Sequence, residues 1–363
     1  TQGEQVAGVW KPLYDRFGIH IDFAYRTFRW DSEASLKAHV HCVIVGFSVQ
    51  DNPCKKLLFT SERVQYVQNI SPYLIDAPTL FIENRSKPIC LVPEICKGSQ
   101  PTDGGNLIIT ESEYNDFIRR EPSSIKYIRL FLGADEFLNG KKRYCLWLVG
   151  ASPKELQAMP LVLERVKKVR EFRQSSKKAA TRKQADTPTL FTENRQPLEN
   201  FIAIPEVSSG TRRYIPMGFL NSNIICSNKL QLLPSASIYH FAVLMSNVHM
   251  AWMRSVCGRL KSDYDYSARI VYNNFPWSTP TDEQRAKIEQ TAQAILDARN
   301  LYPDCSLADL YDEATMPPEL RKAHQQNDKA VMQAYGFWGK LNTESACVAE
   351  LMKMYQKLAE GKA

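Results

Sequence analysis

The sequence predicts a mixed α/β protein of three parts, and three patterns support this prediction. Residues 1–59 combine a helix with two apolar strands, residues 60–277 mix short strands and turns with helices, and residues 278–363 carry only helical periodicity. The length of 363 residues suits two or three domains. The contents of 44% hydrophobic and 23% charged residues are those of an ordinary globular protein.

The first part begins with a helix. Apolar residues recur at helical spacing over residues 2–17, and Gly18 ends the pattern. Strands are expected at 19–25 and 39–47, and the second is apolar at most positions, as in a sheet covered on both faces. We therefore expect residues 1–59 to be the last part of an α/β domain.

Short strands separated by turns are expected through most of the second part. Residues 80–95 have the pattern of a strand, a turn and a second strand. A Gly/Pro/Asp cluster then precedes a strand that ends at Thr110. Two more strands are expected over 124–137 and 141–150, with the Asn139-Gly140 dipeptide as the turn between them.

Further helices and strands complete the second part. Ser152 is placed to cap a helix that begins at Pro153. More strands are expected within 198–234. A long helix is predicted from about Ala236 to Cys257, followed by a last strand over 267–277.

The third part is predicted to be helical throughout. Thr281 and Gln284 form a capping-box pattern at the start of its first helix. A short helix is expected after Ser306, and another over residues 344–358.

Composition excludes several classes of protein. No apolar run reaches the roughly 18–20 residues that a membrane span needs, and the first residues do not form a signal peptide. Nine scattered cysteines without a Cys-x-x-Cys pair favour reduced thiols in a cytoplasmic protein and no metal site. The net charge of +7 permits a polyanionic partner without requiring one.

The residues needed for methyl transfer to adenine are missing. Binding of S-adenosylmethionine needs a Gly-rich turn, and adenine-N6 transfer needs an Asn/Asp-Pro-Pro-aromatic loop around the flipped base. The sequence has no Gly-x-Gly, and its only Pro-Pro pair is followed by Glu319. Its only Glu-x-Lys, which ends at Lys362, lies too close to the terminus to hold a nuclease metal. We therefore assign no catalytic, cofactor-binding or metal-ligating residue.

Three segments are candidates for contact with nucleic acid. The first is a basic run over 165–183, with nine Lys/Arg against one acid. Such a run suits contact with phosphates, and it equally suits a solvated helix face and a flexible linker. Its candidate residues are Lys177, Lys178, Arg182 and Lys183.

The second segment is 206–213, EVSSGTRR. A carboxylate accepts a hydrogen bond from cytosine N4, arginine donates to guanine, and serine hydroxyls hold phosphates. The alternative is a surface turn that leads into a strand. The candidate residues are Glu206, Ser208, Ser209, Arg212 and Arg213.

The third segment is 258–277, in which basic, aromatic and amide side chains alternate. This mixture suits nucleic acid, and it equally suits a polar junction between domains. Its candidate residues are Arg259, Lys261, Tyr264 and Tyr266.

Several blocks in order along the chain resemble the MmeI-like (Type IIL) restriction–modification proteins. They are GIHIDFAYRTFRWDSEASLKAHVHCVIVGF, PTDGGNLI, GADEFLNGKKRYCLWL, RRYIPMGFL, HMAWMRSVCGRLKSDYDYSARIVYNNFPW and ILDAR…SLADLYDEATMPPELRKAH. The long block that ends in NNFPW is the most specific of them.

The resemblance implies what each part is. Residues 1–59 would be the end of an adenine-N6 methyltransferase domain, residues 60–277 a target recognition domain, and residues 278–363 a C-terminal helical domain. It also implies double-stranded DNA as partner, an upstream methyltransferase domain in the same polypeptide, and S-adenosylmethionine as cofactor of the full-length protein but not of this fragment. The alternative is a non-catalytic protein-interaction module of a phage-defence complex.

Overall fold

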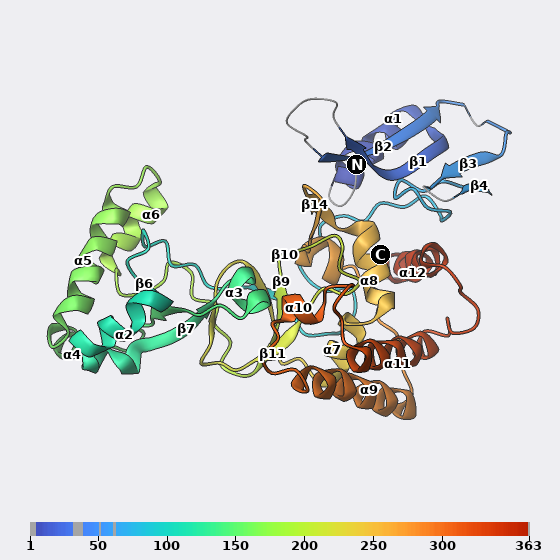
Figure 1. The fold of residues 1–363 in the computed structure, drawn as a ribbon. Coiled ribbons are helices and arrows are strands. Elements are labelled where there is room, and N and C mark those ends of the chain that lie inside the picture. Colours follow the sequence, from blue (N-terminus) through green and yellow to red (C-terminus); the bar gives the residue numbers. More distant parts are fainter. Residues whose placement is uncertain (1–4, 32–38, 51, 61–62, 362–363) are drawn as a thin grey trace.

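The computed structural model forms three regions (Figure 1). We call them the N-terminal unit (5–75), the outer lobe (99–196 with 225–226) and the central body, which the other described residues make. The structure describes residues 5–31, 39–50, 52–60 and 63–361. The mixed α/β class predicted from the sequence is confirmed.

The N-terminal unit is a four-stranded sheet with one helical segment. The π-helix η1 (Val6–Trp10) continues into α1 (Lys11–Phe17), which ends at Gly18 with a left-handed φ of 59°. Val6 and Trp10 are buried in the same apolar cluster as the central body, so this segment docks the unit there. The sheet has the order β2-β1-β3-β4, with β1 (His20–Asp31), β2 (His39–Ser48), β3 (Lys56–Phe59) and β4 (Val64–Val67).

The outer lobe has a core of its own. Its sheet has the order β12-β7-β8-β6, with β6 (Ile108–Thr110), β7 (Ile128–Leu132), β8 (Arg143–Leu146) and β12 (Ile225–Cys226). The helices are α2 (Glu111–Arg120), η2 (Pro122–Tyr127), α3 (Ala134–Asn139), α4 (Pro153–Gln157), α5 (Pro160–Gln174), α6 (Ala179–Lys183) and η3 (Gln184–Asp186). Val162, Val166 and Val169 of α5 pack into this core.

The central body is built on an antiparallel sheet of order β11-β9-β13-β5. Its strands are β5 (Cys96–Lys97), β9 (Phe201–Pro205), β11 (Gly218–Leu220) and β13 (Leu230–Pro234). Every residue of β9 is buried, so this strand lies at the centre of the body. A smaller sheet of order β10-β15-β14 lies beside it, with β10 (Val207–Ser208), β14 (Gly258–Leu260) and β15 (Asp263–Asp265).

Helices complete the central body. They are α7 (Ile238–Leu244), α8 (Asn247–Val256), η4 (Ala268–Tyr272), α9 (Asp282–Asn300), α10 (Leu307–Leu310), α11 (Pro318–Ala334) and α12 (Glu344–Glu360). The cap predicted at Thr281 is confirmed, because its hydroxyl accepts from the Gln284 N–H. The predicted short helix after Ser306 is α10, and the Ser306 hydroxyl accepts from the Asp309 N–H. Helix α11 packs along α9, and α12 packs on α8.

Several sequence-based predictions were wrong. The single helix from Ala236 to Cys257 is two helices, because the Ser246 hydroxyl accepts from the His249 N–H and starts α8 anew. Residues 267–277 form η4 and a turn rather than a strand. Segment 80–95 has no strand, since its backbone pairs with η4 and the turn after it, as in Arg85 N–H to Arg269 O at 3.1 Å.

Two more differences concern helices. Within 124–137 only β7 is a strand, and helical turns η2 and α3 flank it. The sequence analysis did not identify α2 or α11 as helices. Both are mostly polar, so few apolar residues mark their buried face in the sequence.

Candidate nucleic-acid interface

Two hollows lie near the small sheet β10-β15-β14. The first, of about 630 Å³, lies between the N-terminal unit and the central body, and we call it the charged hollow. The second, of about 800 Å³, lies where the 210–213 loop meets the helices of the central body, and we call it the helical hollow. Together they contain most of the candidate residues from segments 206–213 and 258–277.

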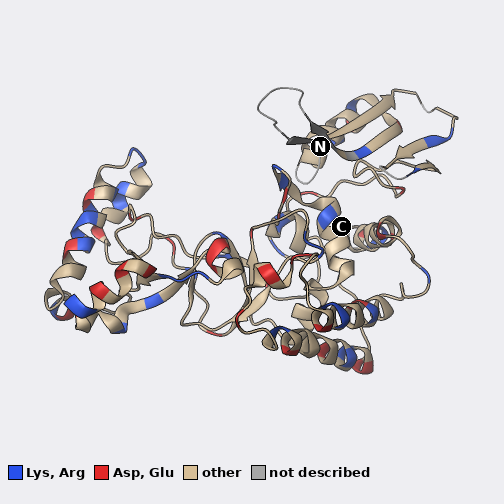
Figure 2. Cartoon of the chain, in the orientation of Figure 1, with Lys and Arg blue, Asp and Glu red and all other residues tan. Residues whose placement is uncertain are grey.

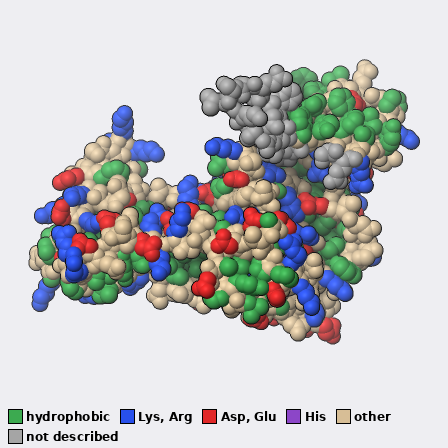
Figure 3. Space-filling view, in the orientation of Figure 1, with side chains coloured by type: hydrophobic (Ala, Val, Ile, Leu, Met, Phe, Trp, Pro, Cys, Tyr) green, Lys and Arg blue, Asp and Glu red, His purple; other side chains and the backbone are tan. Residues whose placement is uncertain are grey.

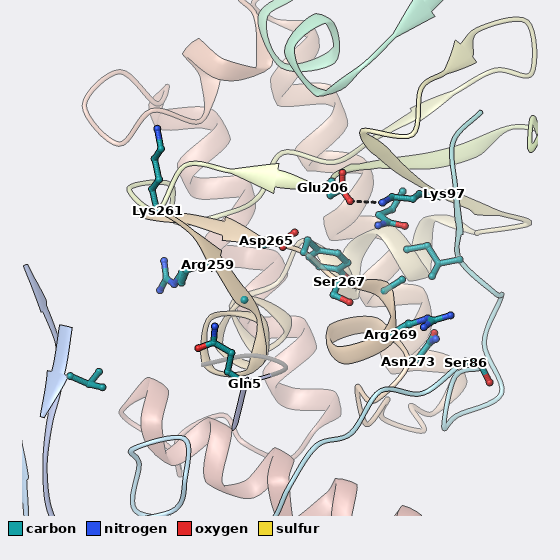
Figure 4. Close-up of a pocket in the computed structure, with 16 residues that line it drawn as sticks. Gln5, Ser86, Lys97, Glu206, Arg259, Lys261, Asp265, Ser267, Arg269 and Asn273 are labelled. Atoms are coloured by element: carbon teal, nitrogen blue, oxygen red, sulfur yellow. Dashed lines mark ion pairs between the residues drawn. The ribbon is translucent and has the colours of Figure 1, made fainter. Parts of the chain in front are cut away.

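The charged hollow gathers side chains from distant parts of the chain (Figure 4). Glu206 lies at its inner wall, where Lys97 Nζ is 2.7 Å from Oε1 and Lys229 Nζ is 3.7 Å from Oε2. Arg259 and Lys261 enter from the β14–β15 hairpin. The remaining charged groups in the lining are Arg269 and Asp265.

Cations outnumber acids in this lining, with Lys97, Arg259, Lys261 and Arg269 against Glu206 and Asp265. A positive hollow attracts an anion, and the Glu206 carboxylate adds an acceptor held in place by two ammonium groups. The arrangement therefore suits a polyanion that also presents hydrogen-bond donors, such as the base edges of a nucleic acid.

The helical hollow contains Arg212, Arg213 and Tyr264. Arg254 on α8 closes one side by a two-point ion pair to Glu344 on α12, with Nε–Oε1 and Nη2–Oε2 distances of 2.9 and 2.8 Å. The same guanidinium donates to the Arg213 carbonyl at 2.9 Å. Glu206 thus lines one hollow and the arginine pair lines the other, although all three come from one short segment.

The serines of this segment have structural contacts. Ser208 is 2% exposed and pairs with Tyr264 in the β10–β15 ladder. The Ser209 hydroxyl lies 2.9 Å from the Thr211 hydroxyl and helps to form the turn. In this conformation, Ser208 does not present its hydroxyl to a phosphate.

The two tyrosines of the third segment are also buried. Tyr266 has no exposed surface, and its hydroxyl lies 2.9 Å from His249 Nε2. Burial lowers the pKa of His249 to about 3, so this pair is neutral. Tyr264 is 5% exposed and supports Arg259, whose guanidinium carbon lies 3.8 Å from the ring centre. Neither ring is placed to stack on a base.

The basic run splits into buried and exposed groups. Arg173 has no exposed surface and donates all its hydrogen bonds to main-chain carbonyls, so it serves the fold. The exposed members at the tip of the outer lobe are Lys177, Lys178, Arg182 and Lys183. None of these four forms an ion pair within the described residues. We call them the lobe tip.

The lobe tip and the β14–β15 hairpin, which supplies two cations of the charged hollow, lie on opposite sides of one notch. Figure 2 shows Lys and Arg at the top of the outer lobe near α6, and again on the β14 hairpin of the central body. Figure 3 shows the surface hollowed between these two places. The notch therefore has positive charge on both flanks.

The sequence analysis did not identify Lys97 or Lys229. Each is a single cation with no motif around it. Only the pairing of β13 with both β5 and β9 brings Lys97 near Glu206. No local pattern in the sequence carries that information.

Some kinds of site are absent from the described residues. Across the ranges that the structure describes, no group of three or more His, Cys, Asp or Glu is arranged to hold a metal ion. None of the helices within those ranges is long and apolar enough to cross a membrane.

Comparison with known proteins places the chain in a family. The model of the MmeI target recognition domain matches residues 76–279. The chain belongs to the MmeI family. Two further models of that family match its ends, the MmeI DNA-methyltransferase domain at residues 1–60 and the MmeI C-terminal domain at residues 280–362. The resemblance inferred from the sequence is confirmed.

Two relatives support this placement. DNA methyltransferase A of Bacillus subtilis (strain 168) is 40% identical over 360 residues, which are 99% of this chain and 41% of that protein. The structure of the Type IIL restriction–modification enzyme MmeI in complex with DNA is 49% identical, with a TM-score of 0.91 over 99% of this chain and 48% of that one. The chain thus spans less than half the length of these relatives.

Proposed function

We propose that this chain is the sequence-recognising part of a DNA adenine-N6 methyltransferase of a restriction–modification system. The match of residues 76–279 to a target recognition domain carries this proposal. We propose the domain division 1–59, 60–277 and 278–363, with double-stranded DNA as the partner and the notch as its binding surface.

The notch offers two kinds of contact. The lobe tip supplies exposed cations without acidic partners, which suit phosphates on one flank. The charged hollow supplies Arg259, Lys261 and Arg269, together with the Glu206 carboxylate for a base edge such as cytosine N4. Arg212 and Arg213 are the second candidates for base contact, from the helical hollow.

The chemistry of methyl transfer lies outside this chain in our proposal. S-adenosylmethionine would supply the methyl group in the full-length protein, bound by a methyltransferase domain of the same polypeptide. Residues 1–60 match the MmeI DNA-methyltransferase domain and contain no Gly-x-Gly turn. This chain would position the target site, and the upstream residues would bind cofactor and adenine.

The salt dependence of DNA binding tests the role of the lobe tip. Changing Lys177, Lys178, Arg182 and Lys183 to Gln should flatten the slope of log K against log salt by about 3–4, since each lost phosphate contact is worth roughly 0.9. The matched control changes four exposed lysines of the helical part to Gln. They are Lys287, Lys322, Lys353 and Lys357.

An equal slope for both variants would reject the lobe tip as a phosphate contact. Failure of the unaltered chain to bind duplex DNA at low salt would reject the proposed function and favour a protein-interaction module. Selection from a randomised duplex library tests the base contacts. Glu206→Gln, and separately Arg212→Ala with Arg213→Ala, should each change the preferred base at one position.

A further inference from the structure

The β14–β15 hairpin presents an apolar side chain to solvent between two cations. Leu260 ends β14 and is 56% exposed. Arg259 precedes it and Lys261 follows it, and both line the charged hollow (Figure 4). In Figure 1 the hairpin projects from the top of the central body, below the N-terminal unit.

The turn of this hairpin is held in a conformation that lysine rarely adopts. Lys261 has a φ of 57°, in the left-handed region where glycine or asparagine is the usual choice. A non-glycine residue keeps such a conformation only when its surroundings impose it, and such sites concentrate at functional surfaces. Lysine at this position places a cation directly after the exposed leucine.

Neighbouring residues hold the turn from below. A Cβ on Gly210 would lie 2.4 Å from the Ser262 carbonyl oxygen, so the 209–211 loop packs directly on the turn because this residue has no side chain. The Gly210 N–H donates to Asp263 Oδ1 at 3.3 Å. Arg259 stacks on Tyr264 and donates to the Ser262 carbonyl at 3.3 Å.

A rigid apolar tip flanked by cations has a recognisable use on DNA. Proteins that kink a duplex insert Leu, Phe, Ile, Met or Pro between base pairs, while nearby cations hold the phosphates. Enzymes that act on a base also take it out of the stack, which leaves a void. A leucine has the size and polarity to fill such a space, and Arg259 and Lys261 are its neighbours in the sequence.

We propose that Leu260 is a wedge that enters the base stack of the bound duplex at one step, with Arg259 and Lys261 contacting the adjacent phosphates. This inference rests on the proposed function, because it needs a duplex in the notch. It assigns to the hairpin a role in opening the stack, separate from the base contacts of Glu206.

Binding to duplexes with a missing base tests the wedge. The duplex is the preferred sequence from the library selection, and in each test duplex one nucleotide is replaced by an abasic site. A wedge must unstack one base step, so an abasic site there should tighten binding of the unaltered chain by roughly 10-fold or more. Abasic sites at other positions should weaken binding or leave it unchanged.

Three variants separate the wedge from other effects. Leu260→Ala should reduce the abasic preference to less than about twofold, and Leu260→Met should keep it, because methionine also inserts between bases. Gly210→Ala should lose it too, because the turn must move, with folding checked by circular dichroism. Leu301→Ala, at an equally exposed leucine (63%) after α9, is the control and should keep it.

The outcomes are distinct. Absence of any abasic preference in the unaltered chain, or its persistence in Leu260→Ala, would overturn the wedge while DNA binding itself remained. Failure to bind any duplex would overturn the proposed function, and the wedge with it.

Discussion

Replacing Arg173 with methionine should destabilise the outer lobe. The buried guanidinium donates five hydrogen bonds, to the carbonyls of Pro101, Thr102, Gln184, Thr187 and Leu190, at 2.7 to 3.0 Å. These bonds join the end of α5 to two loops, and the second loop follows α6 directly. Methionine fills a similar space but donates nothing.

The expected loss is about 3–5 kcal/mol. A hydrogen bond to a charged group contributes roughly 1.5–3 kcal/mol, and a carbonyl left buried without a donor costs about 1–3 kcal/mol. Five such terms do not add fully, because water entering the site will pair with some of the carbonyls. Arg173→Lys should lose about half as much, since an ammonium has three donors where the guanidinium has five.

Hydrogen exchange measured by mass spectrometry reports this loss region by region. Because every 1.4 kcal/mol is roughly a tenfold change, amides in the outer lobe core should exchange at least about 100-fold faster in Arg173→Met. The control is Arg170→Met, because Arg170 is exposed on the same helix. Equal exchange rates in the two variants would refute the structural role of Arg173. Arg173 would then again be a candidate for phosphate contact, like the rest of the basic run over 165–183.

Three other predictions concern the central body. Tyr266→Phe should cost about 1–3 kcal/mol of stability, because His249 loses its hydrogen-bond partner. The DNA affinity should stay within twofold, because Tyr266 is buried, and a large loss of affinity without loss of stability would contradict this. Asp328, 5% exposed, has its pKa raised by burial to about 6, so its protonation stabilises the fold at pH 4 and that contribution is lost as pH rises through 6. Urea unfolding should therefore show the parent losing roughly 2 kcal/mol relative to Asp328→Asn between pH 4 and 7, and a constant difference would contradict this. Gly98→Ala should lower the melting temperature, because its Cβ would lie 2.2 Å from the Ser227 carbonyl oxygen. The control is Gly8→Ala, which has open space around it and should leave the melting temperature unchanged. Equal melting temperatures for the two variants would contradict this.

Local features of the fold were predictable from the sequence. The caps at Ser152, Thr281 and Ser306 depend on residues three positions apart, so their hydrogen bonds are set by neighbouring side chains. The break between α7 and α8 was missed although Ser246 is a standard cap, because the apolar period continues through it. The irregular segment 80–95 was missed because its partners lie in 269–274.

The candidate site was only partly predictable, for a similar reason. The density of Lys and Arg identified the basic run in the sequence. In the structure Arg173 is buried and Arg182 is exposed, and this difference depends on which loops cover α5. The aromatic residues identified the 258–277 segment as a candidate for contact with nucleic acid. In the structure, however, Tyr266 is buried in the core, and the exposed side chain next to the cations is Leu260. Segment 206–213 was marked as one unit, and the structure divides it between two hollows.

The sequence by itself determined the class of the fold, the helix caps and the absence of methyl-transfer motifs, because each depends on residue types at short spacing. It also determined the family, because ordered blocks of residues identify a family without coordinates. Only the tertiary structure decided which charges meet. Lys97 and Glu206 come together through strand pairing across the central sheet, and the hairpin with Leu260 gains its place beside the notch from the packing of three regions. Long-range contacts of this kind arise from burial and pairing between distant segments, which no short stretch of sequence specifies.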